Sequence, residues 1–294
     1  MVNGMSEMVF ITNPAAGAGI ALKTEEKIRE AIRSKGIEAE FIRSGKPGEA
    51  TAVAKARAEA GCKTVAAIGG DGTNLEVAAG LMGTDCALGI IPAGTGNDLI
   101  KTLGIPKDPL EALDCILERS PKAIDMGLIN GKPFLNVCGT GFDVSVLDHT
   151  IRFKKHFRGL LPYMLGLISA IFGNSPIHVT LNEDGSGETE RSILLCTIAN
   201  GRFIGGGIPI CPEADPTDGQ LDLVYVDAVP RRRIFKYLPG LMKGKILTFP
   251  ITHHSRCREL TLRSPGMRVQ IDGEIIPMDE VCFRIEPGAL RVHC

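Results

Sequence analysis

The chain has 294 residues, enough for one large α/β unit or for two domains of roughly 150 residues each. Apolar residues make up 44% and charged residues 23% of the chain, which is a globular composition. Lysine plus arginine (33) nearly equals aspartate plus glutamate (34), so the net charge is −1. We therefore expect no nucleic-acid partner, and an anionic partner would need a local basic patch.

The cysteines and the apolar segments indicate where in the cell the protein is expected. Nine cysteines are scattered singly, with no C-x-x-C pair and no histidine at metal-binding spacing. We interpret them as reduced thiols of a cytoplasmic protein, mostly in the core. Residues 1–7 are short and polar, so we expect no secretory signal. The uncharged stretch 159–173 is shorter than the about 20 residues of a membrane-spanning helix.

The first third of the chain alternates strand and helix patterns. Strands are expected at 8–12, 38–43, 64–68 and 87–91, and helices from about 20 to 35 and at 49–60, 75–82 and 109–118. Short connections in this order favour a parallel sheet covered by helices, as in a Rossmann-like α/β domain.

After about residue 122 the pattern changes to short strands separated by Asn-Gly and Asp-Gly turns. Strands are expected at 125–129, 133–137, 177–182, 192–199, 220–226, 259–262, 267–271 and 281–285, with helices at about 160–172 and 231–243. This pattern predicts an antiparallel β-sandwich or barrel. We expect domains at 1–124 and 125–285, and the segment of about 286–294 could return to the first.

The strongest local signal is G-G-D-G-T at 69–73, between a predicted strand and a helix. Glycines let backbone N–H groups approach phosphate oxygens, and a helix N-terminus favours negative charge. Asp71 among these donors suggests a divalent cation or a polarised water. The segment is neither a Walker A loop nor a dinucleotide fingerprint, and the protein-kinase H-R-D set is missing. Taken alone, an ordinary tight turn explains it equally well.

Two further glycine-rich turns stand in equivalent positions. N-P-A-A-G-A-G at 13–19 and P-A-G-T-G-N-D at 92–98 also connect a strand to a helix. In an open parallel sheet, all three turns lie at the carboxyl ends of strands, where ligands bind in α/β folds. Three such turns at one edge are poorly explained by packing alone, so we predict a phosphate-binding site there.

These three motifs, in this order and spacing, resemble the diacylglycerol kinase catalytic family, which includes bacterial lipid kinases, sphingosine kinases and ceramide kinases. Through G-G-D-G-T that family is distantly related to NAD kinases and phosphofructokinases. The resemblance covers nearly the whole chain, including D-G-E at 272–274. It implies an ATP-dependent lipid kinase that transfers the γ-phosphate to a hydroxyl of diacylglycerol or a related lipid. It also implies a nucleotide-binding α/β domain, a β-sandwich lipid-substrate domain, and an ATP site between them.

The resemblance implies nucleotide contacts in the three turns and at the Ser44 hydroxyl, where the family usually has threonine. The predicted nucleotide-binding residues are Asn13, Ser44, Gly69, Gly70, Asp71, Gly72, Thr73, Asn74, Leu75, Gly94, Thr95, Asn97 and Asp98. One departure is that Asn74 precedes Leu75, whereas the family usually has an aliphatic residue and then asparagine.

Asp272-Gly273-Glu274 follows an apolar run. If the backbone stays extended, both acids point to the same face, and paired carboxylates suit a general base or a metal ligand. If Asp-Gly forms a hairpin turn, the acids are solvated, and spacing alone favours this alternative. The resemblance points to a proton acceptor here. We expect Glu274 as the base with Asp272 as the alternative, and Asp71 as a further catalytic residue.

A second acidic cluster spans 213–220. Hard cations prefer oxygen ligands, which acidic turns supply, although a solvated acidic turn has the same sequence. The resemblance implies a structural Mg²⁺ held by Asp218 and by the carbonyl groups of Asp215 and Gln220. The Mg²⁺ that accompanies the nucleotide would be a separate ion, with Asp71 a candidate ligand.

Basic residues flank both predicted helices of the second domain. They are Arg152, Lys154, Lys155, His156 and Arg158 before the first, and residues 231–233, 236, 243 and 245 around the second. A short apolar helix with a basic flank suits an anionic membrane surface, and a cover helix with a solvated edge fits equally. We expect a lipid substrate, peripheral contact with membranes, and a homodimer as a further hypothesis.

Two alternatives remain open at this point. An NAD-kinase-like enzyme shares G-G-D-G-T but would not predict the turn at 92–98 or the D-G-E segment. A catalytically silent nucleotide-binding regulator at the membrane is the other, and intact Asp71, Asp272 and Glu274 argue against it.

Overall fold

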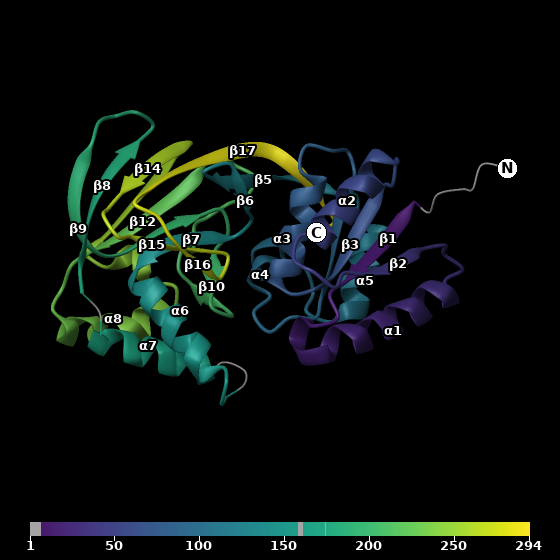
Figure 1. Cartoon of the computed structure of the whole chain (residues 1–294), viewed down its shortest axis with the longest axis horizontal. Coiled ribbons are helices and arrows are strands. Elements are labelled where there is room, and N and C mark those ends of the chain that lie inside the picture. Colours follow the sequence, from purple (N-terminus) through teal and green to yellow (C-terminus); the bar gives the residue numbers. More distant parts are fainter. Residues whose placement is uncertain (1–6, 158–160, 174) are drawn as a thin grey trace. The chain divides into compact units, whose positions relative to one another are not determined.

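The computed structural model describes residues 7–157, 161–173 and 175–294. The described chain divides into two compact units (Figure 1). The N-terminal unit runs to Met126 and includes Pro287–Cys294, and the C-terminal unit is Gly127–Glu286. Strands β5 (Lys122–Ile129) and β17 (Glu280–Val292) carry the chain from one unit into the other.

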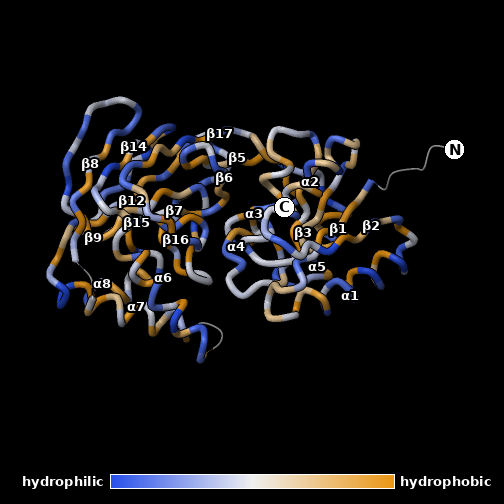
Figure 2. The backbone as a smooth tube through the Cα atoms, viewed as in Figure 1, coloured by the Kyte–Doolittle hydropathy of each residue, from blue (hydrophilic) through white to orange (hydrophobic). Residues whose placement is uncertain are grey.

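A parallel sheet forms the centre of the N-terminal unit, in the order β2-β1-β3-β4-β17. Its other strands are β1 (Met8–Thr12), β2 (Glu40–Arg43), β3 (Thr64–Gly69) and β4 (Ala87–Pro92). Every residue of β3 and β4 is buried, because helices cover both faces of such a sheet. In Figure 2 the tube of β1 and β3 is accordingly mainly orange. The predicted parallel α/β architecture is confirmed.

The helices of this unit are η1 (Ala16–Gly19), α1 (Ile20–Ser34), α2 (Glu49–Glu59), α3 (Asp71–Leu81), α4 (Asp98–Leu103) and α5 (Pro109–Glu118). Helix α5 has the predicted bounds, because Asp108 caps it by accepting from the backbone N–H groups of Leu110 and Glu111. The predicted start of α3 at residue 75 is wrong. The helix begins at Asp71, so the last three residues of G-G-D-G-T form its first turn.

The C-terminal unit is an antiparallel β-sandwich, as predicted. Its main sheet path is β16-β15-β7-β9-β8-β14-β17, and β12 pairs with β9 and β13. The strands are β6 (Lys132–Phe134), β7 (Val137–Gly141), β8 (Ile177–Glu183), β9 (Thr189–Ala199), β10 (Phe203–Ile204), β11 (Ile208–Pro209), β12 (Leu221–Asp227), β13 (Thr252–Cys257), β14 (Glu259–Arg263), β15 (Arg268–Ile271) and β16 (Glu274–Pro277). The predicted strand at 133–137 is wrong, because the chain there divides into β6 and β7.

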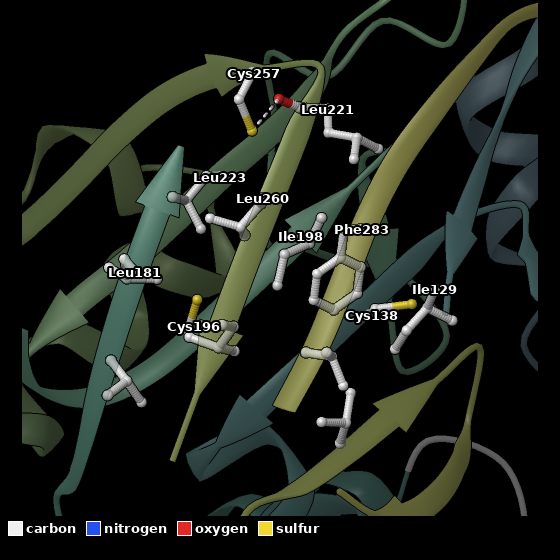
Figure 3. Close-up of a cluster of buried hydrophobic side chains, with 14 of the residues drawn as sticks. Ile129, Cys138, Leu181, Cys196, Ile198, Leu221, Leu223, Cys257, Leu260 and Phe283 are labelled. Carbon is white, nitrogen blue, oxygen red and sulfur yellow. Dashed lines mark hydrogen bonds between the residues drawn. The ribbon is translucent and has the colours of Figure 1, made fainter. Parts of the chain in front are cut away.

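Side chains on the sandwich strands alternate between two apolar clusters. Cys138, Cys196 and Phe283 point into the core between the strands (Figure 3). Neighbouring residues such as Val137 and Leu195 face a second cluster. This second cluster is covered by α6 (Phe142–Phe153), α7 (Leu161–Gly173), α8 (Arg231–Met242) and η2 (Ile246–Thr248). Helix α6 was not predicted, because its valines, isoleucine and threonine are also typical of strands.

The cysteines and the apolar helices can now be placed in the fold. The nine cysteines all lie in the described part of the chain; they are free, and all except Cys282 are buried, as predicted for core thiols. Within residues 7–157, 161–173 and 175–294, no helix is long and apolar enough to span a bilayer. The predicted apolar helix near 160–172 is α7, and the residues just before Leu161 lie outside the described part.

Candidate active site

The three glycine-rich turns of the N-terminal unit touch one another. The backbone N–H of Ala93 donates to Gly69 O at 2.7 Å, and that of Asn13 donates to Ile68 O at 3.2 Å. A Cβ added at Gly94 would overlap the Cα of Gly70, and one added at Gly17 would overlap the carbonyl oxygen of Ala93. The turns therefore form one continuous backbone surface at the carboxyl ends of β1, β3 and β4, which is where phosphate-binding sites form.

Asp71 joins two of these turns. Its Oδ1 accepts from the backbone N–H groups of Asp98 (3.0 Å) and Leu99 (3.4 Å), so it caps the start of α4. Burial raises the pKa of the Asp71 carboxyl, and the nearby charge of Asp98 raises it further. Asp98 also accepts from Lys101 Nζ at 2.8 Å. A divalent cation would relieve the repulsion between the two carboxylates, so their donor set fits Mg²⁺.

The other predicted nucleotide-binding side chains lie along the same edge of the sheet. Ser44 follows β2 and is buried, and its backbone N–H donates to Thr12 O at 2.9 Å. Asn13 accepts from the backbone N–H of Ala15 at 3.0 Å. Asn97 has a positive φ of 50° and donates to Gly94 O at 3.0 Å. Thr95 is exposed between them. The fold thus gathers residues that lie far apart in the sequence.

Asn74 is oriented differently from the turn residues. It is 0% exposed, and in the described part of the chain its amide nitrogen and oxygen have no hydrogen-bond partner. Val77, Ala78 and Leu81 share its side of α3 and are also buried, whereas Leu75 is half-buried. The reversed order of Asn74 and Leu75 therefore buries an amide in a helix-packing face. Its place in the predicted nucleotide site stays a prediction.

The D-G-E segment is a hairpin turn. Asp272 (φ 44°) and Gly273 (φ 99°) connect β15 to β16, and Ile271 pairs with Glu274. Positive φ at both central residues is the geometry that Asp-Gly favours. The extended alternative, with both acids on one face, is therefore wrong.

The two acids of this turn have different surroundings. The Asp272 carboxylate accepts from the backbone N–H groups of Leu135, Asn136 and Val137 at 2.9, 3.2 and 3.1 Å. These bonds hold the turn between β6 and β7, which explains why a single strand does not form there. Glu274 is exposed at the start of β16. Glu274 is therefore the more accessible of the two carboxylates.

The acidic loop before β12 contains the residues predicted to hold structural Mg²⁺. Asp218 accepts from the Gln220 backbone N–H at 3.0 Å, and Asp215 accepts from the backbone and hydroxyl of Thr217. Burial raises the pKa of Asp218, and the charges of Asp222 and Asp215 add to the rise. Arg256, whose Nε lies 3.9 Å from Asp218 Oδ2, offsets part of this negative charge, and clustered oxygen donors of this kind fit a hard cation.

Asp143, in the first turn of α6, is a functional candidate that sequence reasoning missed. Burial raises the pKa of its carboxyl to about 7, and the hydrogen bond from Val144 offsets only part of the rise. A Cβ at Gly139 would overlap its Oδ2. The available signal was C-G-T-G-F-D at 138–143, a further glycine-rich turn from strand to helix.

Comparison with known proteins agrees with this architecture. Residues 7–129 match the family model of the diacylglycerol kinase catalytic domain, and residues 136–294 match that of the YegS C-terminal NAD kinase beta sandwich-like domain. The chain is 31% identical over 294 residues to a diacylglycerol kinase of Mycobacterium tuberculosis (strain ATCC 25618 / H37Rv), covering 98% of this chain and 95% of that protein. The chain belongs to the diacylglycerol kinase family. The resemblance seen in its motifs is confirmed.

One further relative agrees with this family, and two solved structures agree with the fold. A "Probable lipid kinase YegS-like" of Pseudomonas aeruginosa (strain UCBPP-PA14) is 33% identical over 276 residues, covering 91% of this chain and 89% of that protein. A diacylglycerol kinase structure from Bacillus anthracis str. Sterne shares the fold, with a TM-score of 0.72, 22% identity and coverage of 99% and 97%. An NAD kinase from Archaeoglobus fulgidus has a TM-score of 0.52 at 12% identity over 98% of this chain and 93% of that one.

The raised pKa of Asp143 predicts a pH-dependent stability. The folded carboxyl titrates near 7 and an unfolded one near 3.8, so the folded state binds the proton more tightly. Its stabilising contribution is present below the unfolded pKa and is lost as the pH rises through about 7. Relative to Asp143→Asn, the wild-type free energy of unfolding should fall by a few kcal/mol between about pH 4 and pH 7. Urea unfolding across this range measures the difference.

Asp148, on the same helix, supplies the control. Its hydrogen bond with Arg268 at 2.6 Å lowers the pKa of the Asp148 carboxyl, so its titration lies below the tested range. Asp148→Asn should therefore change stability by a constant amount from about pH 5 upward. A constant difference for Asp143→Asn as well would show that Asp143 is ionised throughout.

Proposed function

We propose that this protein transfers the γ-phosphate of ATP to a hydroxyl of diacylglycerol or a related lipid. Membership of the diacylglycerol kinase family supports a kinase that acts on lipids. The single observation that carries the proposal is the continuous surface of three glycine-rich turns around Asp71. Phosphoryl transfer depends mainly on positioning and on neutralising phosphate charge, and such a surface can do both.

Each group in the N-terminal unit has a role in this proposal. The backbone N–H groups of the turns bind the phosphates, and the Ser44 hydroxyl adds a further contact. Asp71, with Asp98 beside it, would hold the nucleotide's Mg²⁺, which neutralises phosphate charge when bound. A second, structural Mg²⁺ would be held by Asp218 and by the carbonyl groups of Asp215 and Gln220.

We propose Glu274 as the group that takes the proton of the acceptor hydroxyl. Glu274 is exposed, and no hydrogen bond in the described chain occupies its carboxylate in the way that three amides occupy Asp272. Amide donors stabilise the charged form of Asp272 and hold it in place, which suits a positioning residue better than a proton acceptor.

An exposed apolar surface of the C-terminal unit supports membrane contact. We define the α7–α8 stripe as Leu161, Ile168, Phe172, Phe235 and Met242, which are 49%, 43%, 65%, 45% and 37% exposed. The rings of Phe172 and Phe235 meet at 6.0 Å between centroids, so the two helices present one surface. Exposed apolar residues of this size in a group mark interaction sites. We propose that the stripe docks on a membrane.

Basic residues beside the stripe indicate an anionic surface. Arg231, Arg232 and Arg233 are exposed in the first turn of α8. Lys154 donates to the Tyr163 hydroxyl at 2.9 Å and lies over its ring, so this lysine also joins α6 to α7. Arg158, which the sequence placed in the same flank, lies outside the described residues. Cytoplasmic location and homodimer formation stay predictions.

The function is tested with γ-labelled ATP, Mg²⁺ and a total lipid extract, followed by mass spectrometry of the labelled product. We expect label in a phosphorylated lipid and none in NAD. Transfer to NAD alone would make the protein an NAD kinase, and absence of transfer to any acceptor would favour a silent regulator.

A pair of variants makes this test specific. Asp71→Asn keeps an oxygen that can cap α4 but removes the charge beside the phosphates, so transfer should fall by roughly 10²-fold or more with the fold retained. Asp108→Asn removes a charge from an equivalent cap on α5 and should leave transfer unchanged. Equal activity of the two variants would show that Asp71 is only a capping residue.

If Glu274 is the base, substituting it should lower turnover, whereas substituting Asp272 should lower stability. Glu274→Gln should lower turnover by ~10²–10⁴-fold with ATP affinity and melting temperature nearly unchanged. Asp272→Asn should lower the melting temperature, because an amide oxygen accepts backbone hydrogen bonds less strongly than a carboxylate. If Asp272→Asn is stable but inactive while Glu274→Gln is active, Asp272 is the base.

The membrane proposal is tested by co-sedimentation with phosphatidylglycerol vesicles. Phe172→Ser and Phe235→Ser should each weaken binding by about tenfold or more, the effect of burying one large apolar side chain. Replacing Arg231, Arg232 and Arg233 with glutamine should cost about 1 kcal/mol per charge. Ile20→Ser and Leu110→Ser, which change exposed apolar residues of the N-terminal unit, are controls. Unchanged binding of the stripe variants would leave α7 and α8 as cover helices.

A further inference from the structure

Cys211, Asp222 and His254 form a cluster that the proposed kinase reaction does not use. The thiol, one carboxylate oxygen and one imidazole nitrogen all lie within 4.8 Å of one another. Cys211 and Asp222 are 0% and 1% exposed, and the His254 side chain is 21% exposed. All three belong to the C-terminal unit. The cluster is therefore a buried set of mixed ligands with one solvent-accessible member.

The strand register explains how these residues meet. Asp222 of β12 pairs with Arg256 of β13, so His254, two residues earlier, is its diagonal neighbour on the same face. This face belongs to the helix-covered cluster, which also contains Cys211 and Val224. The loop carrying Cys211 is held there because its backbone N–H donates to Arg202 O at 3.2 Å.

The two carboxylate oxygens of Asp222 differ in their hydrogen bonding. Its Oδ1 accepts from His254 Nε2 at 2.6 Å and from Arg256 Nε at 3.2 Å. Its Oδ2 is buried and has no hydrogen-bond partner among the described residues. A buried carboxylate oxygen without a partner is costly in free energy. A metal ion bound by this oxygen, the thiol and the imidazole would remove that cost.

We propose that Cys211, Asp222 and His254 bind a transition-metal ion, with Zn²⁺ as the expected occupant. Sulfur, nitrogen and oxygen donors together suit Zn²⁺, whereas Mg²⁺ takes oxygen ligands alone. On binding, the thiol releases its proton to solvent and a metal–sulfur bond forms. His254 exchanges its hydrogen bond with Asp222 for a bond to the metal, and water on its exposed side completes a tetrahedral set. Arg256 stays bonded to the carboxylate.

The proposed site differs from the predicted Mg²⁺ site in the same loop. That site uses oxygen atoms of Asp215, Asp218 and Gln220, and it has no sulfur or nitrogen donor. An ion on Cys211 would attach the start of the loop to β12 and β13. We therefore infer a structural role, in which the metal fixes the loop that carries the Mg²⁺ ligands.

The neighbouring pair of His253 and Asp227 provides a matched control. Its Nε2–Oδ2 distance is 2.9 Å and it joins the same two strands, but its side chains are exposed. His253→Ala should therefore leave any specific metal binding unchanged. His254→Ala should weaken it by at least about tenfold, since even outer partners of metal ligands change affinity by ~10–100-fold.

The full chain is dialysed against Zn²⁺ with excess Mg²⁺, and separately titrated with Co²⁺. We expect stoichiometric Zn²⁺ that Mg²⁺ does not displace, and a sulfur-to-cobalt charge-transfer band that Cys211→Ser abolishes. If Cys211→Ser does not fold, loss of the band in His254→Ala supports the site. Absence of the band in the wild-type protein, displacement by Mg²⁺, or equal loss in His253→Ala would overturn the proposal. None of these measurements depends on kinase activity.

Discussion

The hydrogen bonds that Asp71 accepts from the start of α4 tie together two of the three turns on which the candidate site depends. Gly70 and Gly94 allow the two backbones to approach so closely that a Cβ on Gly94 would overlap the Cα of Gly70. The same carboxylate therefore positions the backbone donors and supplies the charge that a cation would meet. Structural and chemical roles coincide in one side chain, and only a substitution that keeps the acceptor and removes the charge can separate them.

In the C-terminal unit, too, side chains in turns accept backbone hydrogen bonds from other segments. Asn130, Asp184 and Asp272 each have a positive φ and precede a glycine in a hairpin turn. The side chain of each accepts a backbone N–H from another strand or loop: Cys282 for Asn130, Arg258 and Glu259 for Asp184, and 135–137 for Asp272. Asp272 thus belongs to a set of turns that join strands, which explains why its carboxylate is occupied. Within the described residues, the neighbouring Glu274 is exposed and makes no such bond.

The fold class was predictable because it depends on local pattern. Alternating strands and helices indicated the parallel sheet, and Asp-Gly and Asn-Gly pairs indicated the hairpins. The three turns were predictable as a group because carboxyl ends of parallel strands share one edge. The direction in which the Glu274 side chain points was not predictable, because it depends on the φ angles of Asp272 and Gly273. The burial of Asp143 was not either, because it depends on how α6 packs against β7.

The proposed metal site also could not be predicted from the sequence. Cys211, Asp222 and His254 come from a loop and two strands, and their sequence separation matches no metal-binding motif. They meet only because β12 and β13 pair in one particular register. A shift of one residue would turn the Asp222 and His254 side chains to opposite faces. Nonlocal register, which composition and spacing do not encode, therefore decides whether the site exists.

Buried polar atoms without partners have different meanings in different parts of the described chain. Asn97 Oδ1 lies in a candidate phosphate-binding turn, where a bound ligand could satisfy it. Asn74 lies on the packing face of α3, where its unpaired amide costs about 1–3 kcal/mol of stability. Asp222 Oδ2 belongs to a carboxylate whose other oxygen already bonds to His254 and Arg256, and this carboxylate lies beside the thiol of Cys211. The thiol and imidazole donors beside it are the reason that the unpaired oxygen of Asp222 indicates a cation, whereas the burial of the Asn74 amide beside Val77 and Ala78 gives no such indication.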